Sequence, residues 1–402
     1  MPTLHPSDPS GSLVQRLSLE PTASGPLDGL TFTVKDNIDL AGLKTSYGNP
    51  AWRDFHPAPN HNALCVDALL AAGGRCVGKA IADEFTYSLQ GENPWFGTPL
   101  NHRAPDRIPG GSSSGSAASV ANGVADFSLG TDSGGSIRVP ASFCGIWGMR
   151  PSLHRISEAG VLPFMPSVST VGVVSNRFEH LDKVVRTLLS GDEQSPSPLK
   201  RVFVLADAMD ICDDAVQSQA EKALVDLFEP TGIKPEPIRL AQIVGEDLSL
   251  RDCNERTLRP LQTLEFQNTL GSWIEYHKPE TGLGFSMAYE NVRQSDRLGI
   301  LDCRSRRERI FDAMRAWLTP GTVICFPSTP MVAPLKGTLE TREAARDFYD
   351  RTMAITAFAG IGRLPEISAP LLSASGCPVG LSIAAGNQQD ESLLCVLGQL
   401  LG

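Results

Sequence analysis

The sequence lacks several features that define whole classes of protein. Its nine cysteines are an odd number and include no C-x-x-C pair, which argues against a disulfide framework and against a cysteine zinc site. No apolar run approaches the roughly 18 residues of a membrane span. Residues 1–12 show no basic segment followed by an apolar stretch. We therefore expect reduced, mostly buried cysteines and a cytoplasmic protein.

Positive charge is also scarce. The chain carries 35 basic and 45 acidic residues, so its formal net charge at pH 7 is −10. Nucleic-acid phosphates and anionic membrane surfaces are bound by clustered Lys and Arg side chains. We therefore expect neither nucleic acid nor membrane as a partner. A small-molecule substrate fits this charge better, and a homodimer stays open.

Strand-like and helix-like segments alternate along the chain, which predicts an α/β fold. The 402 residues would suit two or three domains of about 150 residues, or one long α/β domain. Residues 190–198 read as a linker, yet strand patterns on both sides of it could equally join one sheet. Strands are expected at 30–34, 75–78, 125–129, 201–205, 322–326 and 378–384. Helices are expected at 62–72, 114–122, 181–189, 213–227, 259–276, 286–298, 305–318, 341–358 and 391–401, with Pro260 suited to a first helical position.

Residues 109–142 differ in composition from the rest, with seven glycines and nine serines. A flexible linker has such a composition, but the helical pattern at 114–122 and the strand pattern at 125–129 interrupt it. Consecutive glycines allow backbone N–H groups to approach a ligand closely. The turn at 133–136 can therefore form an anion-binding nest or an oxyanion hole. A phosphate loop is disfavoured, because no G-x-x-x-x-G-K-[ST] motif is present.

Ser136 ends that turn, which makes it the candidate nucleophile beside its own oxyanion donors. A serine needs a base to attack at neutral pH, and none of the seven histidines lies in a distinctive context. Lys35 directly follows the apolar segment 30–34 and stands where a strand end could bring it into a cleft. To act as a base it would need its pKa lowered from about 10.4 to about 7–8, a shift that burial can supply.

Three separated motifs together resemble the amidase signature family. They are the segments 33–37 (TVKDN), 110–113 (GGSS) and 130–145 (GTDSGGSIRVPASFCG). The family hydrolyses C–N amide bonds with a Ser-cisSer-Lys triad. By motif, the resemblance implies Ser136 as the nucleophile, Ser112 as the bridging serine of a cis peptide bond, and Lys35 as the base. The oxyanion hole would be formed by the backbone amides of Ser133, Gly134, Gly135 and Ser136.

The resemblance also implies the organisation of the whole chain. Residues 1–402 would form a single amidase signature domain, α/β in class, with a mixed central β-sheet covered by helices on both faces. The signature core would span about 27–175, and a strand and a helix at about 360–402 would close the chain. Between them, residues at about 200–330 form a divergent middle with no recognisable family segment.

The implied reaction is hydrolysis of a small carboxylic amide to an acid and ammonia or an amine through an acyl-enzyme. It needs no metal and no organic cofactor. An aryl or indole-acetamide-type substrate would suit a pocket formed by Tyr87, Trp95, Phe96, Phe164 and Met165. Two alternatives stay open: a glutamyl-tRNA amidotransferase A-like subunit, and a non-catalytic amidase-like binding or receptor protein.

The sequence departs from the family pattern at two positions. Ser114 replaces a glycine, a variation associated with the branch that resembles indole-3-acetamide hydrolases. Ser169 stands where many members have an Asp, which could pair with Arg138, so we expect altered packing beneath the signature loop. Two other motif matches carry little weight: the G-x-S-x-G at 111–115 has no strand before it, and the S-x-x-K at 197–200 lies in the linker.

Overall fold

A computed structural model describes residues 8–191, 195–295 and 300–402 and contains one large β-sheet. Its strand order is β1-β3-β2-β4-β6-β5-β10-β11-β9-β7-β8, so strands from both sides of the expected linker join one sheet. The strands are β1 (Leu13–Leu19), β2 (Thr31–Lys35), β3 (Arg75–Ala80), β4 (Phe127–Asp132), β5 (Trp147–Arg150), β6 (Thr170–Ser175), β7 (Arg201–Leu205), β8 (Glu236–Ile238), β9 (Thr322–Pro327), β10 (Glu366–Ala374) and β11 (Cys377–Ala385).

The sheet is mixed. Strands β3, β2 and β4 are parallel, as are β9, β7 and β8. The central strands from β4 through β6, β5, β10 and β11 to β9 pair antiparallel. The carboxyl ends of β2, β4, β5 and β11 and the amino end of β10 consequently meet at the same edge of the sheet. That edge carries both the candidate site and the cavity described further below.

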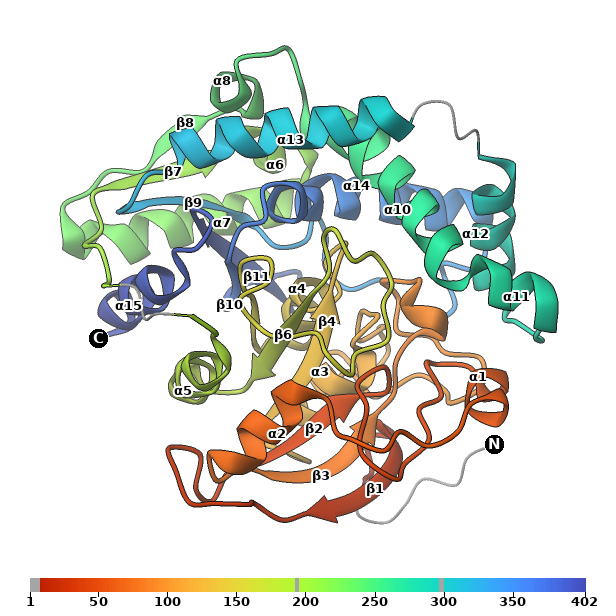
Figure 1. Ribbon diagram of the computed structural model, residues 1–402. Coiled ribbons are helices and arrows are strands. Elements are labelled where there is room, and N and C mark those ends of the chain that lie inside the picture. The colour runs from red at the N-terminus through yellow and green to blue at the C-terminus, as the bar shows by residue number, and fades with distance from the viewer. Residues whose placement is uncertain (1–7, 192–194, 296–299) are drawn as a thin grey trace.

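Helices cover both faces of the sheet (Figure 1). The helices are α1 (Pro50–Phe55), α2 (Leu64–Ala71), α3 (Ser114–Ala121), α4 (Arg138–Cys144), α5 (Phe178–Leu188), α6 (Ala206–Ile211), α7 (Asp214–Phe228), α8 (Leu240–Val244), α9 (Leu250–Cys253), α10 (Arg259–Phe266), α11 (Ser272–His277), α12 (Leu283–Gln294), α13 (Ile300–Trp317), α14 (Arg342–Ile361) and α15 (Asp390–Leu401).

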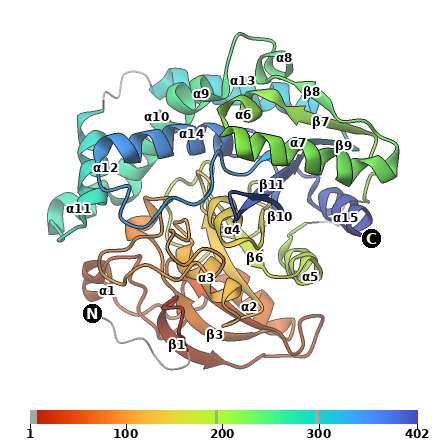
Figure 2. The ribbon, with the colours of Figure 1, turned by 180° about the vertical axis from the view of Figure 1, so that it is seen from behind.

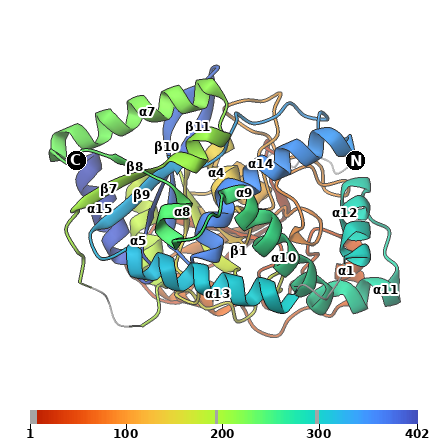
Figure 3. The ribbon, with the colours of Figure 1, turned by 90° about the horizontal axis from the view of Figure 1, so that it is seen from above.

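Successive side chains of a strand point to opposite faces of the sheet, so each face packs into an apolar core of its own. On β4, Phe127 and Leu129 point to the face covered by α2, α5, α7 and α15. On the opposite face, Val174 of β6 packs with Ala117 of α3 and Ile137 beside α4. Seen from above, α7 and α13 lie on opposite sides of β7 and β9 (Figure 3), and α7 crosses the back of the molecule (Figure 2). The predicted α/β domain with a mixed sheet covered on both faces is confirmed.

Several expected helix starts lie a few residues late, as at 286, where α12 begins at Leu283, and the largest difference concerns the helix expected at 259–276. The helix does not begin at residue 259, because residues 250–277 form one helical stretch in which two π-helical turns, 254–258 and 267–271, link α9, α10 and α11. Ser249 caps its start, accepting from the amide of Asp252 at 3.1 Å. Pro260 lies inside this stretch just after the first π turn, where the wider turn accommodates a residue without an N–H.

Several strands were not expected from the sequence, among them the buried strands β6 and β5 and the partly exposed edge strand β1. All nine cysteines are free thiols, seven buried and two half-buried, in keeping with their expected role as small apolar side chains. None of the helices in the described ranges is long and apolar enough to cross a membrane.

Candidate active site

Lys35 and Ser112 form a buried pair at the carboxyl end of β2. Lys35 Nζ lies 2.7 Å from Ser112 Oγ and 2.9 Å from Thr131 Oγ1, and all three residues are buried. Burial lowers the pKa of Lys35 from 10.5 to about 7, although the carboxylates of Asp83 and Asp132 act in the opposite direction. The amine is therefore available in its neutral form near neutral pH.

The peptide bond between Gly111 and Ser112 is cis. The Ser112 carbonyl accepts from the amide of Asp83 at 3.1 Å, which fixes this segment against the loop after β3. A Cβ at position 111 would lie 2.1 Å from Asp83 Oδ2, so only glycine fits there. Asp83 in turn accepts from the amide of Gly91 at 3.0 Å. Burial raises the pKa of Asp83, and the nearby Lys35 acts against that rise.

Ser136 lies beside this pair in the turn between β4 and α4. Its backbone carbonyl accepts from the amide of Ser113 at 3.3 Å, so the two serine segments are adjacent. The Ser136 side chain is 7% exposed. Among the described residues, no hydrogen bond joins its Oγ to Ser112.

The turn at 133–136 presents backbone amides as expected, with one difference. Gly135 donates its N–H to Asp132 Oδ1 at 3.2 Å, whereas the amides of Ser133, Gly134 and Ser136 donate to no acceptor within the described part of the chain. Gly135 has φ +116°, and an added Cβ would lie 2.8 Å from a methyl of Thr356. Three amides, rather than four, are left free for a ligand.

A buried ionic cluster holds this turn from beneath. Asp132 Oδ1 pairs with Arg138 at 2.8 Å and with Arg150 at 3.1 Å, and Arg138 also pairs with Glu366 of β10 at 2.8 Å. Burial alone would raise the pKa of Asp132, but the two guanidinium groups hold it below its usual range. Asp132 Oδ2 also accepts from the amide of Ile137, so a carboxylate that is ionised at neutral pH shapes the turn.

Ser169 occupies the position where an acid was expected to support Arg138. Arg138 loses no partner through this change, since Asp132 and Glu366 both pair with it. Ser169 Oγ instead lies 2.5 Å from Ser133 Oγ and accepts from the amide of Met165 at 3.2 Å. Ser169 thus ties the first residue of the turn to the segment after β5, while Arg138 keeps two carboxylate partners.

Two of the five expected pocket residues lie in one aromatic cluster. The rings of Tyr87 and Phe164 are 5.4 Å apart, and Phe266 of α10 and Phe285 of α12 pack against Tyr87 at 4.9 and 6.1 Å. Met165 belongs to the same apolar core as Phe164. The divergent middle of the chain thus supplies half of this cluster.

Trp95 and Phe96 lie elsewhere. The indole N–H of Trp95 donates to Glu84 Oε1 at 2.9 Å, and the amide of Phe96 donates to Asn93 Oδ1 at 3.0 Å. In the described ranges, neither ring makes a stacking contact with Tyr87 or Phe164. Both are half-exposed, so these two residues are separate from the aromatic cluster.

A very small cavity adjoins Thr131. Its volume is about 20 Å³, enough for one water molecule. Asn37, Thr131, Glu158 and Ser169 line it. Burial raises the pKa of Glu158 to about 7, with Arg150 acting against this rise. Within the described residues, no group of three or more His, Cys, Asp or Glu side chains is arranged to hold a metal ion.

Sequence reasoning did not assign Thr131, Asp83 or the two phenylalanines of the middle region to the site. Thr131 stands inside the signature segment, one residue before Asp132, and strand pairing between β2 and β4 brings it to Lys35. Asp83 follows β3, the strand that pairs with β2, and this place in the sequence was the only indication that Asp83 could belong to the site. Phe266 and Phe285 are far from the motifs in the sequence, so no local pattern indicates their contact with Tyr87.

The structure thus brings a buried lysine and a serine together beside a glycine turn with free amides. The family pattern described as Amidase matches residues 15–227, and the chain belongs to this amidase signature family. It is 34% identical to Amidase 1 of Arabidopsis thaliana, over 97% of both chains.

The chain is also similar to two further proteins. The chain is 30% identical to the translocon at the outer membrane of chloroplasts 64 of Pisum sativum, over 94% of this chain and 66% of that protein. It also matches a crystal structure of an amidase with a TM-score of 0.78 at 27% identity, covering 94% of this chain and 85% of that one. The chain therefore belongs to a family that includes proteins named as amidases and a protein named as part of a chloroplast translocon.

Proposed function

We propose that the chain hydrolyses the C–N bond of a small carboxylic amide with Ser136 as nucleophile, Ser112 as bridge and Lys35 as base. The contact of 2.7 Å between Lys35 Nζ and Ser112 Oγ carries the proposal. The lowered pKa of Lys35, to about 7, supports it because only the neutral amine can accept a proton. The identity of 34% to a plant Amidase 1 agrees with the same reaction.

In the proposed sequence, neutral Lys35 accepts the hydroxyl proton of Ser112 as Ser112 accepts that of Ser136. Ser136 Oγ then attacks the amide carbonyl, and the C–O bond forms while the carbonyl oxygen takes the negative charge. The free amides of Ser133, Gly134 and Ser136 would donate to this oxygen, each such donor being worth about 2.7–4 kcal/mol in acyl transfer. Protonated Lys35 returns the proton through Ser112 to the leaving nitrogen, and water repeats the steps on the acyl-enzyme.

The proposed acyl group is aromatic. Tyr87 and Phe164, with Phe266 and Phe285, present ring edges and faces to one another at centroid distances of 4.9–6.1 Å. Such clusters favour a flat apolar acyl group through offset and edge-to-face contacts. Phe164 also lines the small cavity beside Thr131, so the proposed substrate is an aryl or indole-acetamide-type amide rather than a short aliphatic one.

The experiment is an ammonia-release assay with the purified chain across aliphatic, phenylacetamide-type and indole-type amides. Ser136→Ala is compared with Ser114→Ala, a serine of the same segment that lies outside the proposed triad. The proposal expects release by wild type and by Ser114→Ala, and loss in Ser136→Ala. Full activity of Ser136→Ala would overturn the assignment, and ammonia transfer to an acceptor without hydrolysis would favour the amidotransferase alternative.

A further inference from the structure

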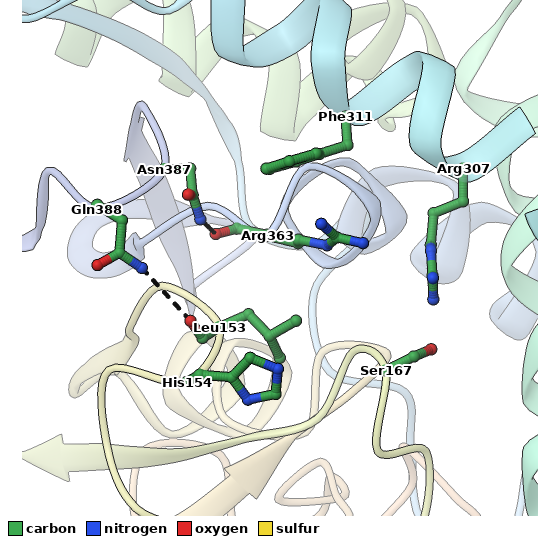
Figure 4. A pocket seen from close by; sticks show the side chains of 8 residues that line it. All are labelled: Leu153, His154, Ser167, Arg307, Phe311, Arg363, Asn387 and Gln388. Carbon is green, nitrogen blue, oxygen red and sulfur yellow. Dashed lines mark hydrogen bonds between the residues drawn. The ribbon is translucent and has the colours of Figure 1, made fainter. Parts of the chain in front are cut away.

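A cavity of about 440 Å³ lies at the same sheet edge as Lys35, but over a different part of it. Its walls come from the residues after β5, the residues before β10, the turn after β11 and helix α13 (Figure 4). Lys35, Ser112 and Ser136 do not line it. Strands β4 and β6 lie between β2 and β5 in the sheet.

Two arginines dominate its polar wall. Arg307 of α13 and Arg363 after α14 share a single carboxylate, since Glu308 Oε1 accepts from Arg307 Nη2 at 2.7 Å and from Arg363 Nη2 at 2.6 Å. The Arg307 side chain is only 13% exposed. Both guanidinium groups are directed towards the centre of the cavity (Figure 4). One carboxylate therefore pairs with two partly buried cations.

Each arginine keeps a buried N–H without an acceptor. Arg307 Nη1 and Arg363 Nε are buried and have no hydrogen-bond partner among the described residues. An unsatisfied buried donor costs about 1–3 kcal/mol, and more when the group is charged. Arg307 and Arg363 both line a space large enough for a small organic ligand.

The remaining walls are mainly apolar, with the imidazole ring of His154 as a polar group. Phe311 packs under Arg363, whose guanidinium carbon is 4.2 Å from the ring centroid, so Arg363 is held flat against the ring. Leu153 and His154 form the opposite wall (Figure 4). Ser167 also lines the cavity, and its hydroxyl donates to Glu265, which is the second carboxylate close to this space.

The backbone around the cavity is strained. His154, Arg363 and Gln388 have φ values of +66°, +52° and +64°, and they are three of the eight non-glycine residues with positive φ in the described ranges. Left-handed conformations of such residues cluster at ligand sites because the surrounding structure holds them there. Asn387 Nδ2 donates to the carbonyl of Arg363 at 2.6 Å, and Gln388 N–H donates to Ser152 Oγ at 2.8 Å. These bonds hold the turns at Arg363 and Gln388 in place.

We propose that this cavity binds the oxyanion group of a small molecule, a carboxylate or a phosphate, between Arg307 and Arg363, with the apolar body of the ligand against Phe311 and Leu153. Planar guanidinium groups match the geometry of both oxyanions. A cationic ligand is disfavoured, because the carboxylate of Glu308 already pairs with both Arg307 and Arg363. The site is independent of the amide-hydrolysis proposal, since it contains none of the residues assigned to that reaction.

Calorimetric titration of the purified full chain tests the proposal at constant ionic strength, without any amide present. Inorganic phosphate and benzoate are the probes, and benzyl alcohol is the uncharged analogue of benzoate. We expect saturable 1:1 binding of at least one anion and at least tenfold weaker binding of benzyl alcohol. Binding of phosphate alone identifies a phosphate site, and binding of benzoate alone identifies a carboxylate site.

Substitutions locate the binding. Arg307→Gln is expected to weaken anion binding at least tenfold, whereas Arg309→Gln, on the same helix but 52% exposed, should match wild type within twofold. Arg307→Lys keeps the charge beside Glu308 but loses the planar fork, and it serves as the second variant if Arg307→Gln fails to fold. Absence of anion binding in wild type, or equal binding by Arg307→Gln or Arg307→Lys and wild type, would overturn the proposal.

Discussion

Lys35 Nζ lies 2.7 Å from Ser112 Oγ, and both side chains are almost fully buried. Burial sets the charge of this amine, since it lowers the pKa of Lys35 to about 7 against the opposing effect of Asp83 and Asp132. A lysine in this state can accept a proton near neutral pH, which an exposed lysine cannot do to any useful extent.

The first prediction concerns pH. If neutral Lys35 is the base, kcat/KM should rise with pH through an apparent pKa of about 7 and level off above it, because deprotonation produces the active form. Lys35→Arg keeps a permanent charge and should reduce kcat/KM by about 10²–10⁴-fold. A rate profile measured from pH 5.5 to 9 checks both points. A flat wild-type profile would contradict the assignment of Lys35.

The glycine turn leads to the second prediction. Gly135→Ala places a Cβ 2.8 Å from Thr356 at a φ of +116°, so we expect a loss of about 1–3 kcal/mol of stability and a sharp fall in kcat. Gly134→Ala is the matched control, since its nearest new contact is the Met353 methyl at 3.5 Å. Urea unfolding and steady-state kinetics measure the difference. Equal stability of the two variants would argue against a strained turn.

The third prediction concerns the ionic cluster. Arg138→Met leaves Asp132 and Glu366 buried without their common partner, which should cost about 3–5 kcal/mol. Arg177→Met removes an arginine whose partner Glu179 is exposed, and it should change stability by less than about 0.5 kcal/mol. Urea unfolding at pH 7 distinguishes them, and a loss below 1 kcal/mol in Arg138→Met would refute the role of the cluster.

The cluster also has a pH dependence. The folded-state pKa of Asp132 lies below its unfolded value of 3.8, so its stabilisation is present above that pH and is lost as the pH falls through the folded-state pKa. The stability difference between wild type and Arg138→Met should therefore shrink only in strongly acidic solution.

The fourth prediction concerns Ser169. Its hydroxyl lies 2.5 Å from that of Ser133, the first residue of the turn. Ser169→Ala removes this partner and should destabilise the chain by about 1–3 kcal/mol while lowering kcat more than it changes KM. Ser157→Ala, whose hydroxyl makes an exposed contact, is the control. If kcat is unchanged in Ser169→Ala, the contact supports only the fold.

The sequence predicted the strands that carry the motifs because their apolar runs and glycine boundaries are local features. The carboxyl end of β2 at Lys35 and the turn at 133–136 fall where the pattern indicated. Local patterns did not indicate which strands pair, and strand pairing is what brings Thr131 to Lys35. The same limit applies to Glu366, which reaches Arg138 from the other end of the chain.

The middle of the chain was the least predictable part. The expected helix start near Pro260 was wrong, because the Ser249 cap and a π turn extend the helix towards the amino end. Phe266 and Phe285 join Tyr87 only through tertiary packing, so their spacing in the sequence gives no sign of a pocket. The same holds for Arg307 of α13 and Arg363 in the turn after α14, which are far apart in the sequence.

The most direct test of the central proposal is the site of covalent labelling by a fluorophosphonate, located by peptide mass spectrometry. A serine activated through Ser112 and Lys35 should form a single adduct on Ser136, and Lys35→Arg should reduce its rate by about the same 10²–10⁴-fold as the hydrolysis rate. Labelling at a different serine, or no labelling of a folded and active chain, would contradict the proposed triad.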